Sequence, residues 1–403
     1  MRRLVVAVSK AGINLLYALL CAVRRRDDHA LFLSRQAEEP SYDFKALARE
    51  FEKRGWKTRM HLKKVSKRNL PSYVIHVVKE IDLLSQAKIV LLDRYDPIIS
   101  LIRFKNESHP EFSSSRDKHL HTDYPVEPVV IQVWHAFGAF KKFGYQSVGT
   151  REGHSEEVTD VFSIHRNYSW IICSGEHCRK SFAEAFNYPV SRVLPMNRPE
   201  YDELREMGSK TAPKSDPSRK PLFLFAPTLR KSKASRHPFR DLYRKRESLE
   251  QEVKGAIAWS FHPLEDGLSA PGNVSDMLLE ADALVTDYSS IVYEAYLLGK
   301  PVFFYVPDIG VYRTSPGLNS DPLEIAPHLC ARTQKELAEM LNRHCDNPSA
   351  YPSEELALFA HTAFDEPTGE IAPQLVEFCI EASERAQQPF ADEQQTESVP
   401  ALC

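Results

Sequence analysis

The sequence predicts an α/β protein with two doubly wound parallel sheets whose strand ends face a common cleft. Short runs that are almost wholly apolar, such as 88–93 and 221–225, alternate with segments of helical periodicity in both halves of the chain. Such runs are buried on both faces, which is typical of strands in a parallel sheet covered by helices. A length of 403 residues also exceeds one ordinary core, so we expect two or three domains.

The composition restricts the functional class. Hydrophobic residues make up 42% and charged residues 27%, which is typical of a soluble globular protein and excludes a polytopic membrane protein. The formal net charge of −3 provides no overall field for nucleic acid, so no nucleic-acid partner is expected. Seven scattered cysteines without a C-x-x-C pair predict reduced thiols in the cytoplasm, with neither a disulfide framework nor a zinc site.

The first predicted unit, residues 1–26, is an amphipathic segment. Two arginines precede an apolar stretch over 4–23, Lys10 and Asn14 interrupt this stretch, and three arginines follow it. The run meets arginines where a signal peptide would have small residues, and the polar interruptions disfavour a clean membrane span. Basic flanks and apolar side chains suit a helix at an anionic membrane surface, and packing on the protein's own core is an equally good interpretation.

The second predicted unit, 27–210, has the rhythm of strand, helix and strand. The expected elements are strands at 30–34, from 56, and at 88–93, 129–134 and 170–173, with helices at 43–53 and 75–87 and a helix after Ser174. Residues 105–125 are polar and are expected to form an insertion or loop.

The third predicted unit, 211–386, begins with a linker rich in proline, lysine and serine. The expected elements are strands at 221–225, 256–261, 283–287 and 301–305, and a helix from about 290 to 298. From 387 to 403 the chain is polar and acidic without apolar periodicity, so we expect a disordered tail.

Two histidines occupy equivalent places in the two halves. His135 and His262 each stand at the carboxyl end of a predicted strand, where ligands bind in open α/β sheets. A histidine can act as a general base near neutral pH, or in its charged form stabilise a phosphate oxygen. The alternative is that both are ordinary polar residues at strand ends.

The segment Thr286, Asp287, Tyr288, Ser289, Ser290 is the strongest local signal. A strand followed by two serines at a helix start places hydroxyls and backbone N–H groups at the positive end of a helix dipole, which favours an anion. Simple N-capping by the aspartate or the first serine is the alternative.

Other candidate contacts are acidic, basic or amide side chains near the predicted strand ends. Glu294, one helical turn after the serines, could hold sugar hydroxyls of a nucleotide. Arg230 directly follows a strand end, and Lys141 and Lys142 could pair with phosphate oxygens, although solvated charges are the alternative. The pair Asn197 and Arg198 could shape the floor of the cleft or form a plain turn. Without an acidic cluster that stands out, we expect neither a metal ion nor a cofactor.

Taken together, these motifs resemble one family. In order along the chain they are Trp134-His135 with Phe140-Lys141-Lys142-Phe143-Gly144, Phe182-Ala183-Glu184-Ala185-Phe186, Asn197-Arg198-Pro199, Ala226-Pro227-Thr228, Phe261-His262-Pro263 and Thr286-Asp287-Tyr288-Ser289-Ser290. From about 130 to 380 the chain resembles the CDP-glycerol glycerophosphotransferases, the primases and polymerases of teichoic acid. Its segment after Trp134-His135 is a longer variant of the common family form W-H-G-T-P.

The resemblance implies a GT-B-like pair of Rossmann-type domains at the cytoplasmic face of the membrane, held peripherally. It implies transfer of an alditol phosphate from CDP-glycerol or CDP-ribitol to a hydroxyl of a lipid-linked acceptor, with release of CMP. The family's essential histidines fall on His135 and His262, and its donor-phosphate serines fall on Ser289 and Ser290. A GT-B glycosyltransferase that uses a nucleotide sugar, and a non-catalytic membrane-associated relative, are the alternatives.

Overall fold

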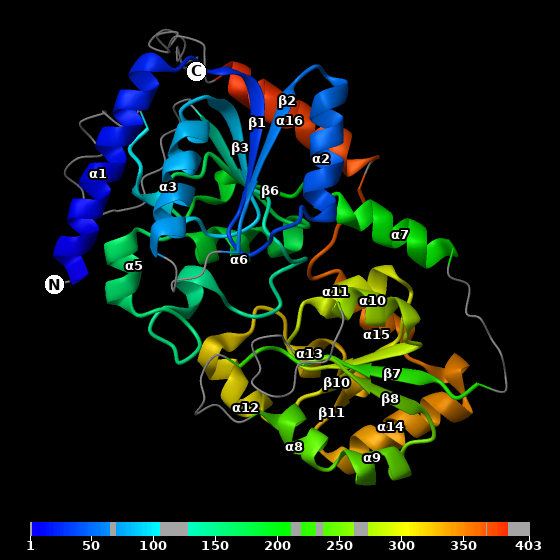
Figure 1. Cartoon of the computed structure of the whole chain (residues 1–403). Helices are drawn as coiled ribbons and strands as arrows, with labels where there is room; N and C mark the ends of the chain where they lie inside the picture. Colours follow the sequence, from blue (N-terminus) through cyan, green and yellow to red (C-terminus); the bar gives the residue numbers. More distant parts are fainter. Residues whose placement is uncertain are drawn as a thin grey trace, which may run out of the picture.

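The structure is a computed structural model, and it describes residues 2–64, 70–104, 128–210, 219–230, 237–261, 273–367 and 369–385. These residues form one parallel sheet of six strands and one of five, each flanked by helices, as Figure 1 shows. The predicted α/β class with two parallel sheets is confirmed.

The first sheet has the strand order β2-β1-β3-β4-β5-β6, with every neighbouring pair parallel. Its strands are β1 (Asp27–Ser34), β2 (Lys57–Leu62), β3 (Ala87–Leu92), β4 (Val129–Gln132), β5 (Trp170–Ile172) and β6 (Val193–Leu194). The helices of this half are α1 (Arg2–Val23), α2 (Tyr42–Lys53), α3 (Leu70–Leu84), α4 (Pro97–Leu101), α5 (Glu156–Phe162) and α6 (Glu176–Phe186). Helix α7 (Glu200–Lys210), which the prediction placed in the unit 27–210, instead packs in the core of the second sheet through Tyr201 and Leu204. The central strands are apolar because helices cover both faces of the sheet.

The second sheet has the order β11-β10-β9-β7-β8 and is also parallel. Its strands are β7 (Leu222–Phe225), β8 (Ala256–Trp259), β9 (Ala283–Thr286), β10 (Val302–Tyr305) and β11 (Cys330–Ala331). The helices that follow α7 are α8 (Pro238–Arg244), α9 (Arg246–Glu252), α10 (Val274–Glu280), α11 (Ile291–Leu297), α12 (Ile309–Tyr312), α13 (Pro322–Ile325), α14 (Gln334–Asp346), α15 (Ser353–Ala360) and α16 (Ile371–Arg385).

Helix α16 returns to the first sheet. Its buried residues Leu375, Val376 and Cys379 pack in one core with strand residues such as Phe32, and Figure 1 shows the helix beside α2. The predicted unit 211–386 groups this helix with the second sheet, which the contacts contradict. An apolar helical pattern shows that a face is buried but not which sheet covers it, so the sequence could not assign it.

Helix α1 is docked on the first half by one face. Tyr17 is 3% exposed and packs edge-on against Phe104, with ring centroids 5.7 Å apart. The side chain of Asn14 donates to the Leu101 carbonyl (3.0 Å) and accepts from the backbone N–H of Arg103 (2.7 Å). The asparagine that interrupts the apolar pattern is therefore the residue that anchors the helix.

The opposite face of α1 is exposed and apolar. The exposed fractions of Val8, Leu15, Leu19 and Val23 lie between 59% and 77%. By length and composition alone, Val6–Val23 could also cross a membrane, since its mean hydropathy is 1.8. One face of α1 thus packs on the core of the protein, as one interpretation predicts. The other face is exposed and apolar, as contact with a membrane surface would require.

The segment that follows β4 joins the two halves. Phe137 and Phe140 are buried in the core of the second sheet, where Phe140 contacts the ring of Phe359 with centroids 4.9 Å apart. Gly138 has φ +57°, and a Cβ at this position would lie 2.5 Å from the Cβ of Ala363. Glycine is needed here both for the backbone conformation and for the close approach.

Backbone hydrogen bonds extend this junction. The Lys142 N–H donates to the Gly317 carbonyl (2.9 Å), and the Phe140 carbonyl accepts from the N–H groups of Asn319 (2.9 Å) and Ser320 (3.2 Å). The junction therefore combines apolar burial with directional bonds, and it fixes the residues next to His135 against the second half.

We predict that Phe140→Ala destabilises the protein by about 3–5 kcal/mol, because it removes a fully buried aromatic side chain and leaves a cavity between the halves. Urea unfolding followed by circular dichroism measures this loss. The matched control Leu358→Ala removes a side chain that is 59% exposed and should change stability by no more than about 0.5 kcal/mol. Equal effects of both substitutions would contradict the assigned packing.

Candidate functional site

His135 lies just beyond β4, at the carboxyl edge of the first sheet. Its Nδ1 is 3.2 Å from the carbonyl oxygen of Asp93, and its ring contacts that of Trp134 with centroids 4.3 Å apart. Trp134 has φ +61°, which is rare for a bulky residue and marks a backbone held by its surroundings. Stacking of the Trp134 ring on Phe143 (5.1 Å) contributes to holding it.

The electrostatics of the cleft keep His135 neutral. His135 is exposed to solvent on one side, yet the protein around its ring removes part of the hydration that would stabilise the charged form. The nearby positive charges of Arg94 and Arg198 disfavour the charged form further. Together they hold the pKa of His135 well below 6.5. With Nδ1–H donating to the Asp93 carbonyl, Nε2 keeps a lone pair and can accept a proton at neutral pH.

Arg198 is buried beneath this site. Its guanidinium lies 2.8 Å from a carboxylate oxygen of Asp43, also pairs with Glu200, and stands over the ring of Phe137 at 4.5 Å. Asn197 has φ +63°, and its side-chain oxygen accepts from the Arg198 N–H (2.8 Å). Both residues are therefore held by contacts within the protein, and their role in shaping the floor of the cleft stays a prediction. Two carboxylates already neutralise the arginine.

Glu294, in the second half, lies near Arg198 and Glu200. Its carboxylate accepts from the Ser275 hydroxyl at 3.4 Å. Burial, and secondly the negative charge of Glu200, raise its pKa to about 7, although Arg198 acts in the opposite direction. Glu294 and the Arg198 cluster thus interact across the junction of the two halves.

Arg230 and Asp287 form the centre of the corresponding edge of the second sheet. The Arg230 guanidinium lies 2.8 Å from Asp287 and 3.3 Å from Asp308, and it stands 4.4 Å from the ring centroid of Tyr312. Asp287 also accepts from the Thr228 N–H at 2.7 Å. The Arg230 side chain is only 4% exposed. It therefore serves mainly to link the ends of three strands.

The hydroxyl residues differ in their surroundings. Thr286 is fully buried and its hydroxyl donates to the Ala226 carbonyl (2.7 Å), so it is held by the sheet. Ser289 and Ser290 are partly exposed at the start of α11. Ser290 is the N-cap residue, and within the described residues its side chain makes no capping hydrogen bond. The alternative of N-capping by Asp287 or Ser289 is therefore not what the structure shows.

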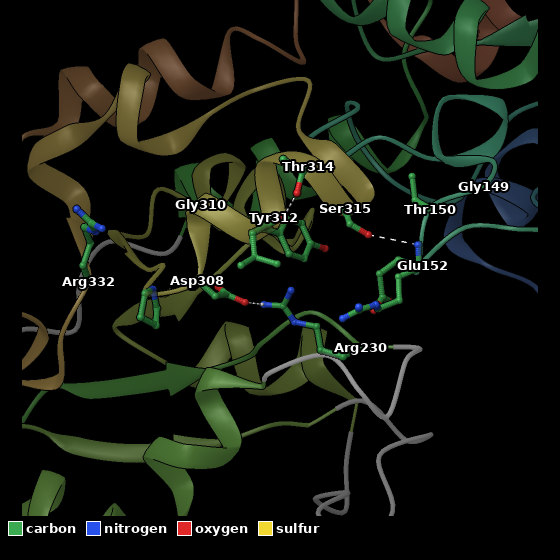
Figure 2. Close-up of a pocket in the computed structure, with 13 residues that line it drawn as sticks. Gly149, Thr150, Glu152, Arg230, Asp308, Gly310, Tyr312, Thr314, Ser315 and Arg332 are labelled. Carbon is green, nitrogen blue, oxygen red and sulfur yellow. Dashed lines mark hydrogen bonds and ion pairs between the residues drawn. The ribbon is translucent and has the colours of Figure 1, made fainter.

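A pocket of about 730 Å³ opens beside Arg230, as Figure 2 shows. Its wall from the first half is Gly149 to Glu152, and the second half contributes residues around Asp308 and Tyr312 together with Arg332. The Arg151 N–H donates to the Ser315 hydroxyl at 3.3 Å, which ties the two walls together. Arg151 and Arg332 are exposed, and within the described ranges neither side chain forms an ion pair.

The remaining predicted residues, Lys141, Lys142 and His262, differ in their surroundings. Lys141 is half-buried, and its charge contributes to lowering the pKa of His135. Lys142 is exposed and its methylene groups pack near Gly317. His262 lies outside the described residues, so its place opposite His135 stays a prediction.

Sequence reasoning did not find several residues of the site. They are Asp43, Arg151, Asp308, Tyr312 and Arg332. Arg332 directly follows the end of β11, and Asp308 is the third residue after β10, so the strand-end rule applied to every strand would have found them. Asp43 is 155 residues from Arg198 and begins a helix, and such a pairing leaves no local signal.

Two facing parallel sheets with titratable groups at their carboxyl edges define a GT-B-like fold. A solved structure of the wall teichoic acid polymerase TagF matches 96% of this chain and 99% of that chain, with a TM-score of 0.65 at 16% identity, which shows the same fold. The chain belongs to the CDP-glycerol:poly(glycerophosphate) glycerophosphotransferase family, whose model matches residues 15–379. The resemblance inferred from the ordered motifs is confirmed.

Two curated relatives illustrate the range of the family. The teichoic acid poly(ribitol-phosphate) polymerase of Bacillus spizizenii is 26% identical over 72% of this chain and 46% of its own length. The teichoic acid glycerol-phosphate primase of Bacillus subtilis is 25% identical over 63% of this chain and 64% of its own length. The matched part of this chain thus spans about half to two thirds of these relatives.

We predict that Glu294→Gln flattens the pH dependence of stability. An ordinary glutamate titrates near 4.5, whereas Glu294 titrates near 7 when folded, so the native state holds the extra proton between these values. Wild-type stability should therefore fall as pH rises through this window, by at most about 1.4 kcal/mol per pH unit for one proton. Urea unfolding at pH 5 and pH 8 measures the difference.

The glutamine variant imitates the protonated side chain and should gain stability relative to wild type at pH 8 but not at pH 5. The control Glu354→Gln, on the exposed start of α15, should show no such pH-dependent gain. If wild type and variant differ in free energy of unfolding by the same amount at both pH values, the raised pKa is refuted.

Proposed function

We propose that the protein transfers an alditol phosphate, most simply glycerol phosphate, from a CDP-activated donor to a hydroxyl of a lipid-linked acceptor, with release of CMP. The product would belong to teichoic acid or a related cell-wall polymer. Membership of the glycerophosphotransferase family carries this proposal, and it agrees with a neutral histidine at the carboxyl edge of the first sheet and with an arginine-lined pocket at the corresponding edge of the second.

In the proposed reaction His135 Nε2 accepts the proton of the acceptor hydroxyl. The oxygen attacks the phosphorus that bears glycerol, the bond from this phosphorus to the oxygen of CMP breaks, and CMP leaves with the electron pair. The neutral state of His135 suits this step, because a protonated imidazole could not accept the proton. His262 is proposed to stabilise the leaving phosphate.

The donor would lie against the second half. The hydroxyls of Ser289 and Ser290 are proposed to meet its phosphates, with Lys141, Lys142 and the arginines of the pocket as further contacts. Glu294 is proposed to face the nucleotide's sugar hydroxyls. Thr286, Asp287 and Arg230 would support this surface from beneath, since their polar atoms already bind the strand ends.

A peripheral position at the cytoplasmic face of the membrane would bring the lipid-linked acceptor to the cleft. The support is the exposed apolar face of α1 together with Val74, Ile75 and Val78 on the neighbouring helix α3, whose exposed fractions are 44–69%. Arg24 and Arg25 directly follow α1 and would meet anionic headgroups.

Purified protein with a lipid-linked primer is predicted to release CMP from radiolabelled CDP-glycerol or CDP-ribitol, and His135→Ala should lower kcat by about a hundredfold or more because it removes the proposed base. Separation of the labelled nucleotides measures both. The control His177→Ala changes an exposed histidine on α6 and should keep normal turnover. Release of UDP from UDP-sugars instead would indicate a glycosyltransferase, and no turnover of any donor would indicate a non-catalytic relative.

The membrane contact is tested by replacing both Leu15 and Leu19 with serine. This change should weaken sedimentation with vesicles of anionic phospholipid, because it removes apolar side chains that are exposed in the folded protein. Deleting the helix would be a poorer test, since Tyr17 belongs to the core. The control Leu358→Ser changes a similarly exposed residue of α15, and equal binding by both variants would contradict the proposal.

A further inference from the structure

A second cluster of polar residues lies between the edge strand β2 and helix α3. His61 is in β2, and His76 and Glu80 are one turn apart on α3, with exposed fractions of 8%, 3% and 0%. One nitrogen or oxygen atom from each residue lies within 4.8 Å of the others, and His76 Nε2 is 3.5 Å from a carboxylate oxygen of Glu80. Potential ligand atoms from two elements therefore converge on one buried point.

Several of these atoms lack a hydrogen-bond partner in the part of the chain that the structure describes. Both ring nitrogens of His76 and both carboxylate oxygens of Glu80 are buried without a hydrogen-bond partner. The carboxyl group of Asp96 lies next to that of Glu80. A hydrogen bond between the two requires a proton on one of them. Burial of unpaired polar atoms is unfavourable, so native proteins give such groups a partner.

The charges around this cluster are of both signs. The Asp96 carboxylate caps α4, accepting from the Ile98 N–H at 2.7 Å, and its other oxygen lies 3.8 Å from Arg35 Nε. Two carboxylates thus face one guanidinium, and the charge of Glu80 is left uncompensated when it is ionised. Asp96 and Arg35 follow β3 and β1, so this network lies at the same carboxyl edge of the sheet.

The hydrogen bonding of His61 suits a metal ligand. His61 Nε2 lies 3.2 Å from the backbone carbonyl of His76. Donation from Nε2–H to this carbonyl leaves Nδ1 of His61 free to bind a metal ion. Metal-binding histidines usually donate their other ring N–H in this way.

We propose that His61, His76 and Glu80 bind one divalent transition metal ion, with Zn²⁺ as the chemically best fit. Two imidazoles and one carboxylate are a ligand set that zinc prefers, whereas calcium and magnesium prefer oxygen ligands alone. The two rings stack with centroids 4.2 Å apart, so binding is expected to turn one ring until both nitrogens face the ion. The ion would tie α3, which packs beside α1, to the edge strand of the sheet.

The test uses the full chain after EDTA treatment and dialysis, titrated with Zn²⁺ in a calorimeter and with Co²⁺ by visible absorption. We expect one equivalent of Zn²⁺, a four-coordinate cobalt spectrum and a rise in Tm. Both His76→Ala and Glu80→Gln should lower affinity by more than the roughly 10–100-fold that loss of an outer-shell partner causes. Glu80→Gln keeps the shape of the side chain, so it gives the answer if His76→Ala does not fold.

A matched control is the pair His328 and Glu355, which contact each other at the surface, where the His328 side chain is 80% exposed. His328→Ala should leave the affinity and the cobalt spectrum unchanged. The proposal is overturned if the wild-type chain binds less than one equivalent of Zn²⁺, or if Glu80→Gln binds as tightly as wild type. A metal-independent rise in Tm of Glu80→Gln, without metal binding by wild type, would show that Glu80 is held by a shared proton instead.

Discussion

The position of the proposed catalytic base depends on the insertion of the segment after β4 into the second half of the molecule. Phe137 and Phe140 enter the core of the second sheet, and Gly138 allows the backbone to approach Ala363 closely enough for them to do so. On the other side of His135, the left-handed conformation of Trp134 is held by packing against Phe143. The histidine is thus fixed between two apolar anchors, one in each half.

The same arrangement explains the electrostatics of the cleft. Burial of the His135 ring, and secondly the charges of Arg94 and Arg198, keep it neutral, while Asp43 and Glu200 neutralise Arg198 itself. A buried cation without these carboxylates would be costly, so the floor of the cleft needs them irrespective of any substrate. Glu294 joins this network from the second half, and its burial, followed by the negative charge of Glu200, raises its pKa. The charges that face a ligand are therefore set largely by pairs formed within the protein.

Much of this organisation could be predicted from sequence, for a physical reason. Buried parallel strands are almost wholly apolar, and ligand-binding residues gather at their carboxyl ends. His135 could therefore be placed at the carboxyl edge of the first sheet, and Arg230 and the serines before α11 at that of the second, without any contact information. Pairings between distant segments could not. Asp43 with Arg198, Asp308 with Arg230, and His61 with His76 and Glu80 each join elements whose relative positions follow from packing. The return of α16 to the first sheet has the same cause, because an amphipathic helix shows that it is covered but not by what.

The pairing of Arg230 bears on how a phosphate would be bound. The guanidinium is almost completely buried and stands over Tyr312, and its ion pairs with Asp287 and Asp308 both use Nη2. A phosphate that bound this nitrogen would have to displace a carboxylate. Separating a buried ion pair costs about 3–5 kcal/mol when one charge is left alone, which would consume much of the new interaction. The exposed Arg151 and Arg332 carry no such cost, and they enter the pocket from opposite halves of the molecule. Because Arg151 belongs to the first half and its backbone already bonds to Ser315 of the second, an anion held by both arginines would strengthen the contact between the halves that places His135. In the proposed reaction, donor binding and positioning of the base would then be linked through the same interface.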